Sequence, residues 1–205
     1  MKKVLITDYG MGNIDSVARA VQECGGEPMI SNKAEDFEKA HYIILPGVGA
    51  FATGMNHLFN SGLHEILYEQ VINKGIPFLG ICLGMQLLAT RGLEGGETKG
   101  LGWIAGEVKR LEPDTPDIRI PHVGWNEVIF DKPSPLFQGI PSGKDFYFVH
   151  SYHFLCQNTQ EAIAYTPYCG KFVSAVNKDN IFGVQFHPEK SQRLGFHVLK
   201  NFLSL

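Results

Sequence analysis

Cysteine is scarce in this chain of 205 residues, and the few thiols that it has are not paired in the sequence. Cys24, Cys82, Cys156 and Cys169 form no CxxC motif. This scatter argues against a zinc site or a disulfide framework and fits a reducing compartment. We therefore expect neither a metal nor another cofactor, and each cysteine has to be interpreted from its own neighbours.

The sequence also lacks a long apolar run near its N-terminus and any excess of positive charge. Only Val4 to Ile6 are apolar before Asp8, which is too short a run for a signal-peptide core or a membrane span. We therefore expect a cytoplasmic protein with no membrane partner. The formal net charge of −3 lacks the basic excess that binding to a phosphate backbone requires, so no nucleic-acid partner is expected.

Strand-like and helix-like segments alternate in the first half of the chain. Apolar runs predict strands, and each is followed by a helix-like stretch; the strands are expected within 2–10, 41–51 and 76–81, and the helices within 13–26, 55–75 and 82–90. This alternation predicts an α/β fold with a doubly wound, mainly parallel sheet and helices on both faces.

The second half of the chain does not continue this alternation of strands and helices. From Gly92 onward, short strand-like segments with turn signals predict an additional, partly antiparallel region, in which one continuous strand is expected within 145–155. Loops are expected at 111–121 and 131–145, and a closing helix at 195–203. The total length suits one substantial domain, so we expect residues 1–205 to form a single unit.

Cys82 is the cysteine with the most informative surroundings. Gly80 and Gly84 flank it at the point where a strand gives way to a helix. This Gly-x-Cys-x-Gly spacing resembles a nucleophile elbow, a tight turn that needs neighbours without side chains. A helix that starts there would favour the thiolate form of the cysteine. The alternative is a small buried residue of structural importance only, since free cysteine is often buried.

A base for such a nucleophile stands at the end of a later strand. His187 follows an apolar run, Glu189 lies two residues further on, and Pro188 stiffens the turn between them. An imidazole oriented by a carboxylate is the usual partner of a catalytic thiol. In isolation this motif is equally typical of a capped surface histidine.

Acyl transfer at Cys82 also requires donors for a negatively charged oxygen. The backbone N–H of Leu83, directly after the cysteine, is one expected donor. The glycine-rich loop around Gly47 and Gly49 can supply the other, because glycine lets the backbone approach a substrate closely.

Taken together, these motifs resemble the class I glutamine amidotransferase family. The resemblance is carried by GICLGMQ, HPE and LPGVGAF, and nearly the full length of the chain agrees with it. Within the family, DYGMGNI, PGVGAF, GWN, FVHSYHF and HPEKSQRLG resemble the branch of glutaminase subunits of imidazole glycerol phosphate synthase.

The resemblance implies a role for each matching residue. Cys82 would be the nucleophile, His187 the acid/base and Glu189 its orienting partner. The oxyanion would be bound by the backbone of Leu83 and Val48. The substrate-binding residues would be Gly49, Gln86, Glu94, Ser151 and Tyr152, with Glu94 on the α-ammonium group and Ser151 and Tyr152 on the α-carboxylate. Without the resemblance, these positions would be interpreted as ordinary helix, loop and strand residues.

The resemblance further implies the substrate and the partner. L-glutamine would be hydrolysed to glutamate, and ammonia would pass to a separate cyclase subunit that acts in histidine biosynthesis. Because free ammonia is protonated in water, we expect the cyclase to cover the face around Cys82, in contact with Asn13, Phe51, Trp125 and Lys190. In the alternative interpretation, Trp125 is a core residue and Lys190 a solvated charge.

Three other functions stay open at this point. The chain could serve another ammonia-dependent synthase, although PGVGAF, GWN and HPEKSQ weigh against this. It could be a cysteine peptidase or general hydrolase, which would not need Gln86 or Glu94. It could also be a catalytically silent regulatory subunit, against which the intact set of Cys82, His187 and Glu189 argues.

Overall fold

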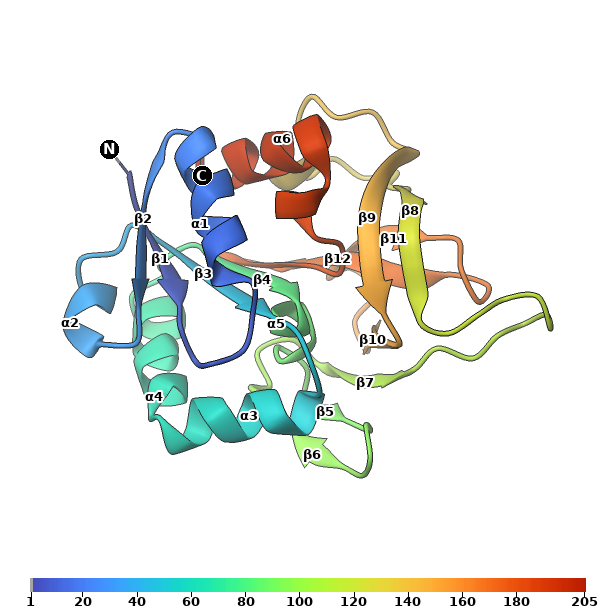
Figure 1. Cartoon of the computed structure of the whole chain (residues 1–205), viewed down its shortest axis with the longest axis horizontal. Helices are drawn as coiled ribbons and strands as arrows, with labels where there is room; N and C mark the ends of the chain where they lie inside the picture. The colour runs from blue at the N-terminus through green and yellow to red at the C-terminus, as the bar shows by residue number, and fades with distance from the viewer. Residues whose placement is uncertain (1) are drawn as a thin grey trace.

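The computed structural model describes residues 2–205, in which helices flank one large sheet and a two-stranded sheet lies beside it (Figure 1). Five neighbouring strands of the large sheet run parallel in the order β2-β1-β3-β4-β13. Their bounds are β1 Lys2–Thr7, β2 Gly26–Ser31, β3 Tyr42–Gly47, β4 Phe78–Cys82 and β13 Ile181–Val184. This confirms the predicted parallel sheet, although β2 was not predicted as a strand.

The rest of the large sheet comes mainly from the second half of the chain and is mostly antiparallel. Its strands are β12 Phe172–Lys178, β10 Tyr152–Cys156, β7 Gly106–Arg110, β5 Arg91–Gly92, β6 Thr98–Lys99 and β11 Ala162–Thr166. The two-stranded sheet consists of β8 His122–Val128 and β9 Lys144–His150, which are antiparallel. The predicted antiparallel region is therefore confirmed.

Helices cover both faces of the parallel strands, as predicted. On one face lie α1 Ile14–Glu23 and α6 Gln192–Phe202, which Figure 1 shows side by side. On the other face lie α3 Phe51–Asn60, α4 Leu63–Tyr68 and α5 Leu83–Gln86. The remaining short elements are α2 Ala34–Phe37, the π-helix η1 Glu69–Asn73 and the 3₁₀ helices η2 Pro135–Phe137 and η3 Pro188–Lys190.

The strands of the parallel region are apolar on both faces, which explains why helices cover both. Successive strand residues point to opposite sides. Val4 and Ile6 of β1 accordingly pack with Val17 and Leu199 of the α1 and α6 layer, whereas Leu5 belongs to the hydrophobic cluster on the opposite face. Within residues 2–205, no helix combines the length and the hydropathy needed to cross a membrane.

Three predicted elements are interrupted in the structure. The helix expected over 55–75 breaks at Gly62, whose φ of 71° is not helical. The helix expected over 82–90 ends at Gln86, because the chain turns and the Thr90 N–H bonds to the Gly106 carbonyl at the start of β7. The continuous strand expected within 145–155 bends at Ser151, where the chain leaves the two-stranded sheet for the large one.

Candidate active site

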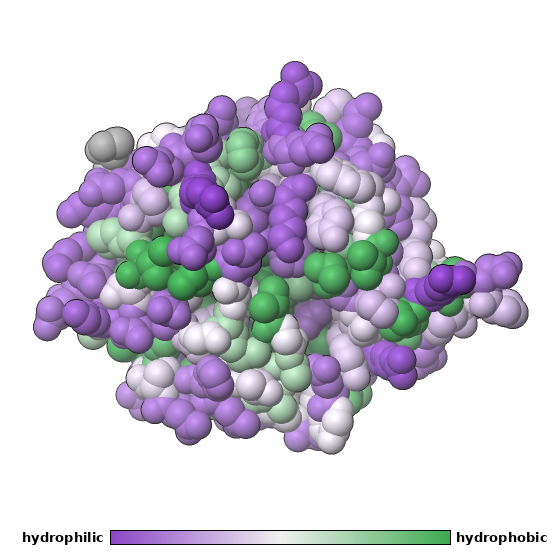
Figure 2. All heavy atoms as spheres, in the orientation of Figure 1, coloured by the Kyte–Doolittle hydropathy of each residue, from purple (hydrophilic) through white to green (hydrophobic). Residues whose placement is uncertain are grey.

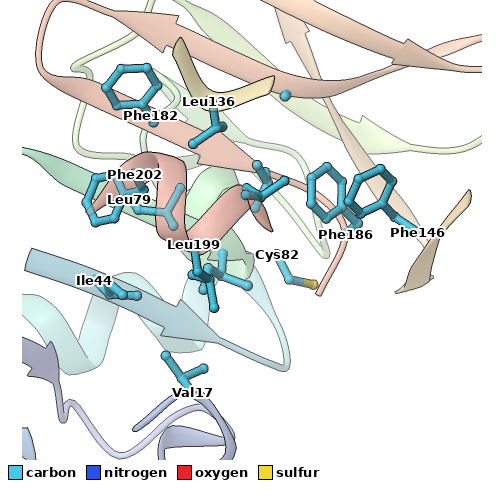
Figure 3. Packing of buried hydrophobic residues seen from close by; sticks show 14 of the residues in the cluster. Val17, Ile44, Leu79, Cys82, Leu136, Phe146, Phe182, Phe186, Leu199 and Phe202 are labelled. Carbon is cyan, nitrogen blue, oxygen red and sulfur yellow. The ribbon is translucent and has the colours of Figure 1, made fainter. Parts of the chain in front are cut away.

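The carboxyl ends of three adjacent parallel strands converge on Cys82. Gly47 at the end of β3 is the register partner of Cys82 at the end of β4. On the other side, Val184 of β13 pairs with Ile81, so that the next residue, Gln185, follows beside Cys82. Figure 3 shows Cys82 at the margin of the buried cluster, with its sulfur turned away from the aliphatic side chains behind it. This is where sites form in open parallel sheets.

The backbone at Cys82 has the strained geometry of a nucleophile elbow. Its φ of 54° and ψ of −108° are unusual for a residue with a side chain. A Cβ added at Gly80 would lie 2.6 Å from the Gly84 carbonyl oxygen, and one added at Gly84 would overlap the Leu45 carbonyl oxygen. The turn thus requires glycine at both flanking positions, which is the physical reason for the spacing seen in the sequence.

The sulfur of Cys82 is nearly buried and lies among polar groups. The residue is 6% exposed, and the thiol donates a weak hydrogen bond of 3.9 Å to the Val149 carbonyl oxygen. The side-chain amide of Gln185 donates to the same sulfur over 3.6 Å. A cysteine in a purely structural role would face apolar side chains, so these contacts favour a reactive one.

His187 and Glu189 form a buried pair, in the relation predicted from the sequence. The Nδ1 atom of His187 lies 2.7 Å from the Oε1 atom of Glu189. The backbone of His187 is also fixed, because the Ser191 hydroxyl donates to the His187 carbonyl and the His187 N–H donates to the Tyr147 carbonyl. The carboxylate therefore fixes both the orientation and the tautomer of the ring.

The charged form of His187 is favoured despite its burial. Burial lowers the pKa of the imidazole, but the neighbouring Cys82 sulfur and the Glu189 carboxylate outweigh burial and raise the pKa to about 10. The Nε2 atom is buried and has no hydrogen bond of standard geometry to any residue within 2–205, although the sulfur is near enough to influence it. This nitrogen is the free position at which a proton can be exchanged.

A cavity of about 230 Å³ opens next to the thiol. Its size suits a small polar molecule better than a drug-sized ligand. It is lined by Cys82 and the predicted residues Val48, Gly49, Leu83, Gln86, Glu94, Ser151 and Tyr152, together with Val149 and His150. The structure therefore brings together every residue that was predicted to contact the substrate or its oxyanion.

Gln86 and Glu94 each keep one polar atom available to a ligand. The Nε2 group of Gln86 donates to the Tyr152 carbonyl and to the Oε1 atom of Gln185, which leaves its carbonyl oxygen without a bond in the described chain. The Oε2 atom of Glu94 accepts from the backbone N–H of Phe51 at 2.8 Å, whereas its Oε1 atom has no partner among residues 2–205. Both side chains are thus held in place, and each keeps one oxygen that can accept a hydrogen bond from a ligand.

The residues predicted to meet a partner fall into two groups. Trp125 lies on β8 rather than in a loop, and 48% of its surface is exposed, so it is not a core residue. Lys190 and Asn13 are also exposed. Phe51 is 1% exposed and packs beneath Gly92, so the prediction that its side chain contacts a partner is wrong. Its apolar ring belongs to the core, and only its backbone serves the site, through Glu94.

Two residues near the thiol were missed by the sequence analysis. Gln185 and His150 are buried polar residues that interrupt apolar strand segments. A polar side chain within an apolar run, next to a suspected catalytic histidine or substrate-binding serine, is the signal that could have identified them, because buried polar groups need specific partners.

Comparison with known proteins assigns the chain to a family. Residues 5–204 match the model of the family described as glutamine amidotransferase class-I. The chain belongs to this family of glutamine-hydrolysing enzymes, and the resemblance to the branch of glutaminase subunits of imidazole glycerol phosphate synthase is confirmed.

Full-length relatives support the branch. The chain is 47% identical over 202 residues to imidazole glycerol phosphate synthase subunit HisH 1 of Campylobacter jejuni (strain RM1221), covering 98% of this chain and 100% of that protein. It is 46% identical over 202 residues to the subunit HisH of Moorella thermoacetica (strain ATCC 39073 / JCM 9320), covering 98% of this chain and 94% of that protein.

Solved structures support the fold at lower identity. The crystal structure of a glutamine amidotransferase superimposes with a TM-score of 0.73 at 19% identity, covering 98% of this chain and 97% of that one. The structure of PurLQS from Thermotoga maritima gives a TM-score of 0.68 at 18% identity, covering 99% of this chain and 98% of that one.

Proposed function

We propose that this chain is the glutaminase subunit of an imidazole glycerol phosphate synthase, in which Cys82 hydrolyses L-glutamine and the ammonia passes to a separate cyclase subunit. The observation that carries the proposal is the position of Cys82 on a strained turn, beside the His187–Glu189 pair and at the wall of a small cavity. The full-length similarity to HisH subunits indicates which synthase is served.

Before the first half of the reaction, the proton of the Cys82 thiol already lies on the Nε2 atom of His187, whose charged form is favoured, and the thiolate attacks the side-chain amide carbon of glutamine. The backbone N–H groups of Val48 and Leu83 stabilise the oxyanion. Both residues line the cavity, directly after the register pair Gly47 and Cys82. When the C–N bond breaks, His187 returns the proton to the departing ammonia, and a thioester remains on the sulfur.

In the second half, water replaces ammonia. His187 takes a proton from the water as its oxygen attacks the thioester carbonyl, and the second oxyanion occupies the same N–H groups. Collapse of this intermediate breaks the C–S bond and releases glutamate. Glu189 orients the ring throughout and stabilises its charged form.

The cavity offers complementary groups for the amino-acid end of glutamine. The free oxygen of Glu94 suits the α-ammonium group, and the free oxygen of Gln86 accepts an N–H from the substrate. Ser151 and Tyr152, at the bend between β9 and β10, face the cavity where the α-carboxylate would lie. A general hydrolase would not need this set of groups, which argues against that alternative.

The docking surface proposed for the cyclase is the exposed face of β8 and β9, defined by Val123, Trp125, Tyr147 and Lys190. The rings of Trp125 and Tyr147 meet edge to face with centroids 6.0 Å apart, and the Lys190 ammonium lies over Tyr147. Figure 2 shows hydrophobic side chains over the region of β8 and β9, among several hydrophobic patches on this face. Because Val149 of β9 contacts the thiol through its carbonyl, a partner on this face would lie close to the released ammonia.

Two broader expectations stand beside this function. We propose that residues 1–205 act as one amidotransferase domain, since the family match extends over nearly all of them. The four cysteines are free, which suits a reducing compartment and supports the cytoplasmic location expected from the sequence.

The function is tested by measuring glutamate and ammonia formation from glutamine, with and without a HisF-type cyclase and its ribonucleotide substrate. We expect hydrolysis that depends on Cys82 and synthesis of imidazole glycerol phosphate from glutamine. If glutamine is hydrolysed but the ammonia supports no cyclase, the chain serves another synthase. If glutamine is not hydrolysed under either condition while the cyclase still binds, the chain is a silent regulatory subunit.

A further inference from the structure

We propose that Gln185 is a further catalytic residue, whose side-chain amide donates a hydrogen bond to the sulfur of Cys82 and stabilises the thiolate. This inference rests on the proposed role of Cys82 as the nucleophile. It assigns a function to a residue that stands two positions before the acid/base His187 and that the mechanism above leaves unused.

Gln185 occupies the position from which a side chain reaches the sulfur. It directly follows β13, the strand next to β4, and its residue surface is fully buried. Its Nε2 atom lies 3.6 Å from the Sγ atom of Cys82, within hydrogen-bond distance for sulfur. A buried amide in this place needs a specific partner, and here that partner is the reacting atom.

The direction of this hydrogen bond is fixed by a second amide. Gln86 donates from its Nε2 group to the Oε1 atom of Gln185, over 3.0 Å. If the Gln185 amide were reversed, two N–H₂ groups would face each other, and its oxygen would face the sulfur. Only the orientation with the N–H directed at Cys82 satisfies both contacts.

The second amide is itself anchored by a chain of neutral groups. Gln86 also donates to the Tyr152 carbonyl at 2.9 Å, and this carbonyl accepts a further hydrogen bond of 2.9 Å from His150. His150 in turn lies 3.0 Å from His122. Burial lowers the pKa of His150 to about 3 and that of His122 to about 4, so both imidazoles stay neutral near neutral pH.

The chemical consequence follows from the charge on sulfur. A thiol is a weak acceptor, whereas a thiolate accepts a charge-assisted bond of greater strength. The Gln185 amide cannot take up the thiol proton, so the proton moves to Nε2 of His187 and Gln185 favours the charge left behind. When the C–S bond forms, sulfur loses this charge and the hydrogen bond weakens. Gln185 therefore acts chiefly on the population of the attacking thiolate.

The test replaces Gln185 with side chains of similar size that donate no hydrogen bond, Gln185→Met and Gln185→Leu. The matched control is Ser174→Ala, on the adjacent strand β12, because Ser174 is buried and its carbonyl accepts the backbone N–H of Gln185. Each full-length protein is assayed for the rate of Cys82 alkylation by iodoacetamide between pH 5 and 10, for melting temperature, and for glutamine hydrolysis with the cyclase bound.

We expect both Gln185 variants to move the midpoint of the pH profile of Cys82 alkylation upward by about one unit, and therefore to alkylate about 10-fold more slowly at pH values below the wild-type midpoint, since a hydrogen bond to a charged group contributes about one tenfold factor or more. Their glutaminase kcat/KM should fall by a similar factor. The control should keep the wild-type profile. A wild-type profile in folded Gln185 variants would overturn the proposal and assign Gln185 to structure.

A measurement on the wild-type chain keeps the proposal testable if both variants fail to fold. In NMR spectra, the chemical shift of the Gln185 side-chain N–H should move downfield as Cys82 ionises and return when Cys82 is alkylated. A chemical shift that does not change when Cys82 ionises would overturn the proposal. Labelling of wild-type Cys82 by a glutamine analogue tests the nucleophile separately. If that labelling fails, the proposed function is wrong; if it succeeds while Gln185 has no effect, only this inference is wrong.

Discussion

The ends of the parallel strands and the exposed face of β8 and β9 lie close together, yet they are built in opposite ways. At the strand ends, backbone atoms are packed so closely that the turn around Cys82 has no room for a Cβ at Gly80 or Gly84. On β8, Trp125 stands half exposed on a strand whose other face contributes to the core. The difference separates two requirements, because bond-making needs fixed atoms whereas recognition of a partner needs an accessible surface.

The two tryptophans show the same contrast within one residue type. Trp103 is 5% exposed and packs edge to face on Phe78 in the core, whereas Trp125 meets only Tyr147 among the aromatic rings of the described residues. A tryptophan can therefore serve stability or association depending on where the fold places it. The same substitution at Trp103 in the core therefore serves as the control for a substitution of Trp125 on the surface.

The largest effect is expected at the nucleophile. Cys82→Ala should lower glutamine hydrolysis by at least about 10⁴-fold, because no other group can form the thioester. The fold should survive, since alanine fits the space of the thiol. Ammonia release in the presence of the cyclase measures the loss, with Cys169→Ala as the control that should retain activity. Residual thioester-dependent turnover in Cys82→Ala would contradict the assignment.

The next largest effect tests the closed packing of the turn. Gly84→Ala would force a methyl group onto the Leu45 carbonyl oxygen, and we expect a loss of about 4 kcal/mol or more in the free energy of unfolding. Gly95→Ala, where no atom lies within 4 Å of the added carbon, should cost only about 1 kcal/mol from its positive φ. Urea unfolding of both variants measures the difference. Equal losses of unfolding free energy in the two variants would show that the turn around Cys82 has room for a side chain at position 84.

The open surface is tested by the two tryptophans. Trp125→Ala should weaken binding to the cyclase by about tenfold or more, with little change in melting temperature, because an interface aromatic contributes about 2 kcal/mol or more. Trp103→Ala should instead destabilise the subunit by about 3 to 5 kcal/mol. Titration calorimetry beside melting curves separates the two. Unchanged affinity in Trp125→Ala would move the docking surface elsewhere.

The smallest expected effect concerns pH and the buried ion pair. The folded-state pKa of His187 is raised to about 10, above the ordinary value of 6.5, so its charged form stabilises the fold fully below pH 6.5 and this contribution is lost as the pH rises through 10. The difference in unfolding free energy between wild type and His187→Gln should therefore narrow by about 1 kcal/mol or more over that interval. A difference that stays constant with pH would contradict the raised pKa.

The sequence was sufficient to predict features that rest on local pattern. Alternating apolar runs predicted the parallel strands, and the glycines around Cys82 predicted the elbow, since both depend on short-range geometry. The strand β2 was missed because GEPMIS contains a proline and a glutamate and has few apolar residues to mark it. The break at Ser151 was missed because a change of sheet depends on distant strands.

The prediction of site residues was limited because the sequence does not show which side chains are buried. Phe51 was expected at an interface because it follows a glycine-rich loop, but whether a side chain packs inward depends on tertiary contacts such as that with Gly92. Gln185 was overlooked because its polar side chain within an apolar run indicates only a buried polar contact, whereas the sulfur and amide that it contacts are distant in the sequence. Motifs predict which residues react, whereas the groups that support them depend on the folded chain.

The most direct test of the central claim is mass spectrometry after treatment with a chloroketone analogue of glutamine, with the cyclase bound. We predict one covalent adduct per chain, located on Cys82, with protection by excess glutamine and much slower labelling in His187→Ala. An adduct on Cys24, Cys156 or Cys169 instead, or labelling of Cys82 that glutamine does not prevent, would contradict the account of Cys82 as the glutamine-hydrolysing nucleophile.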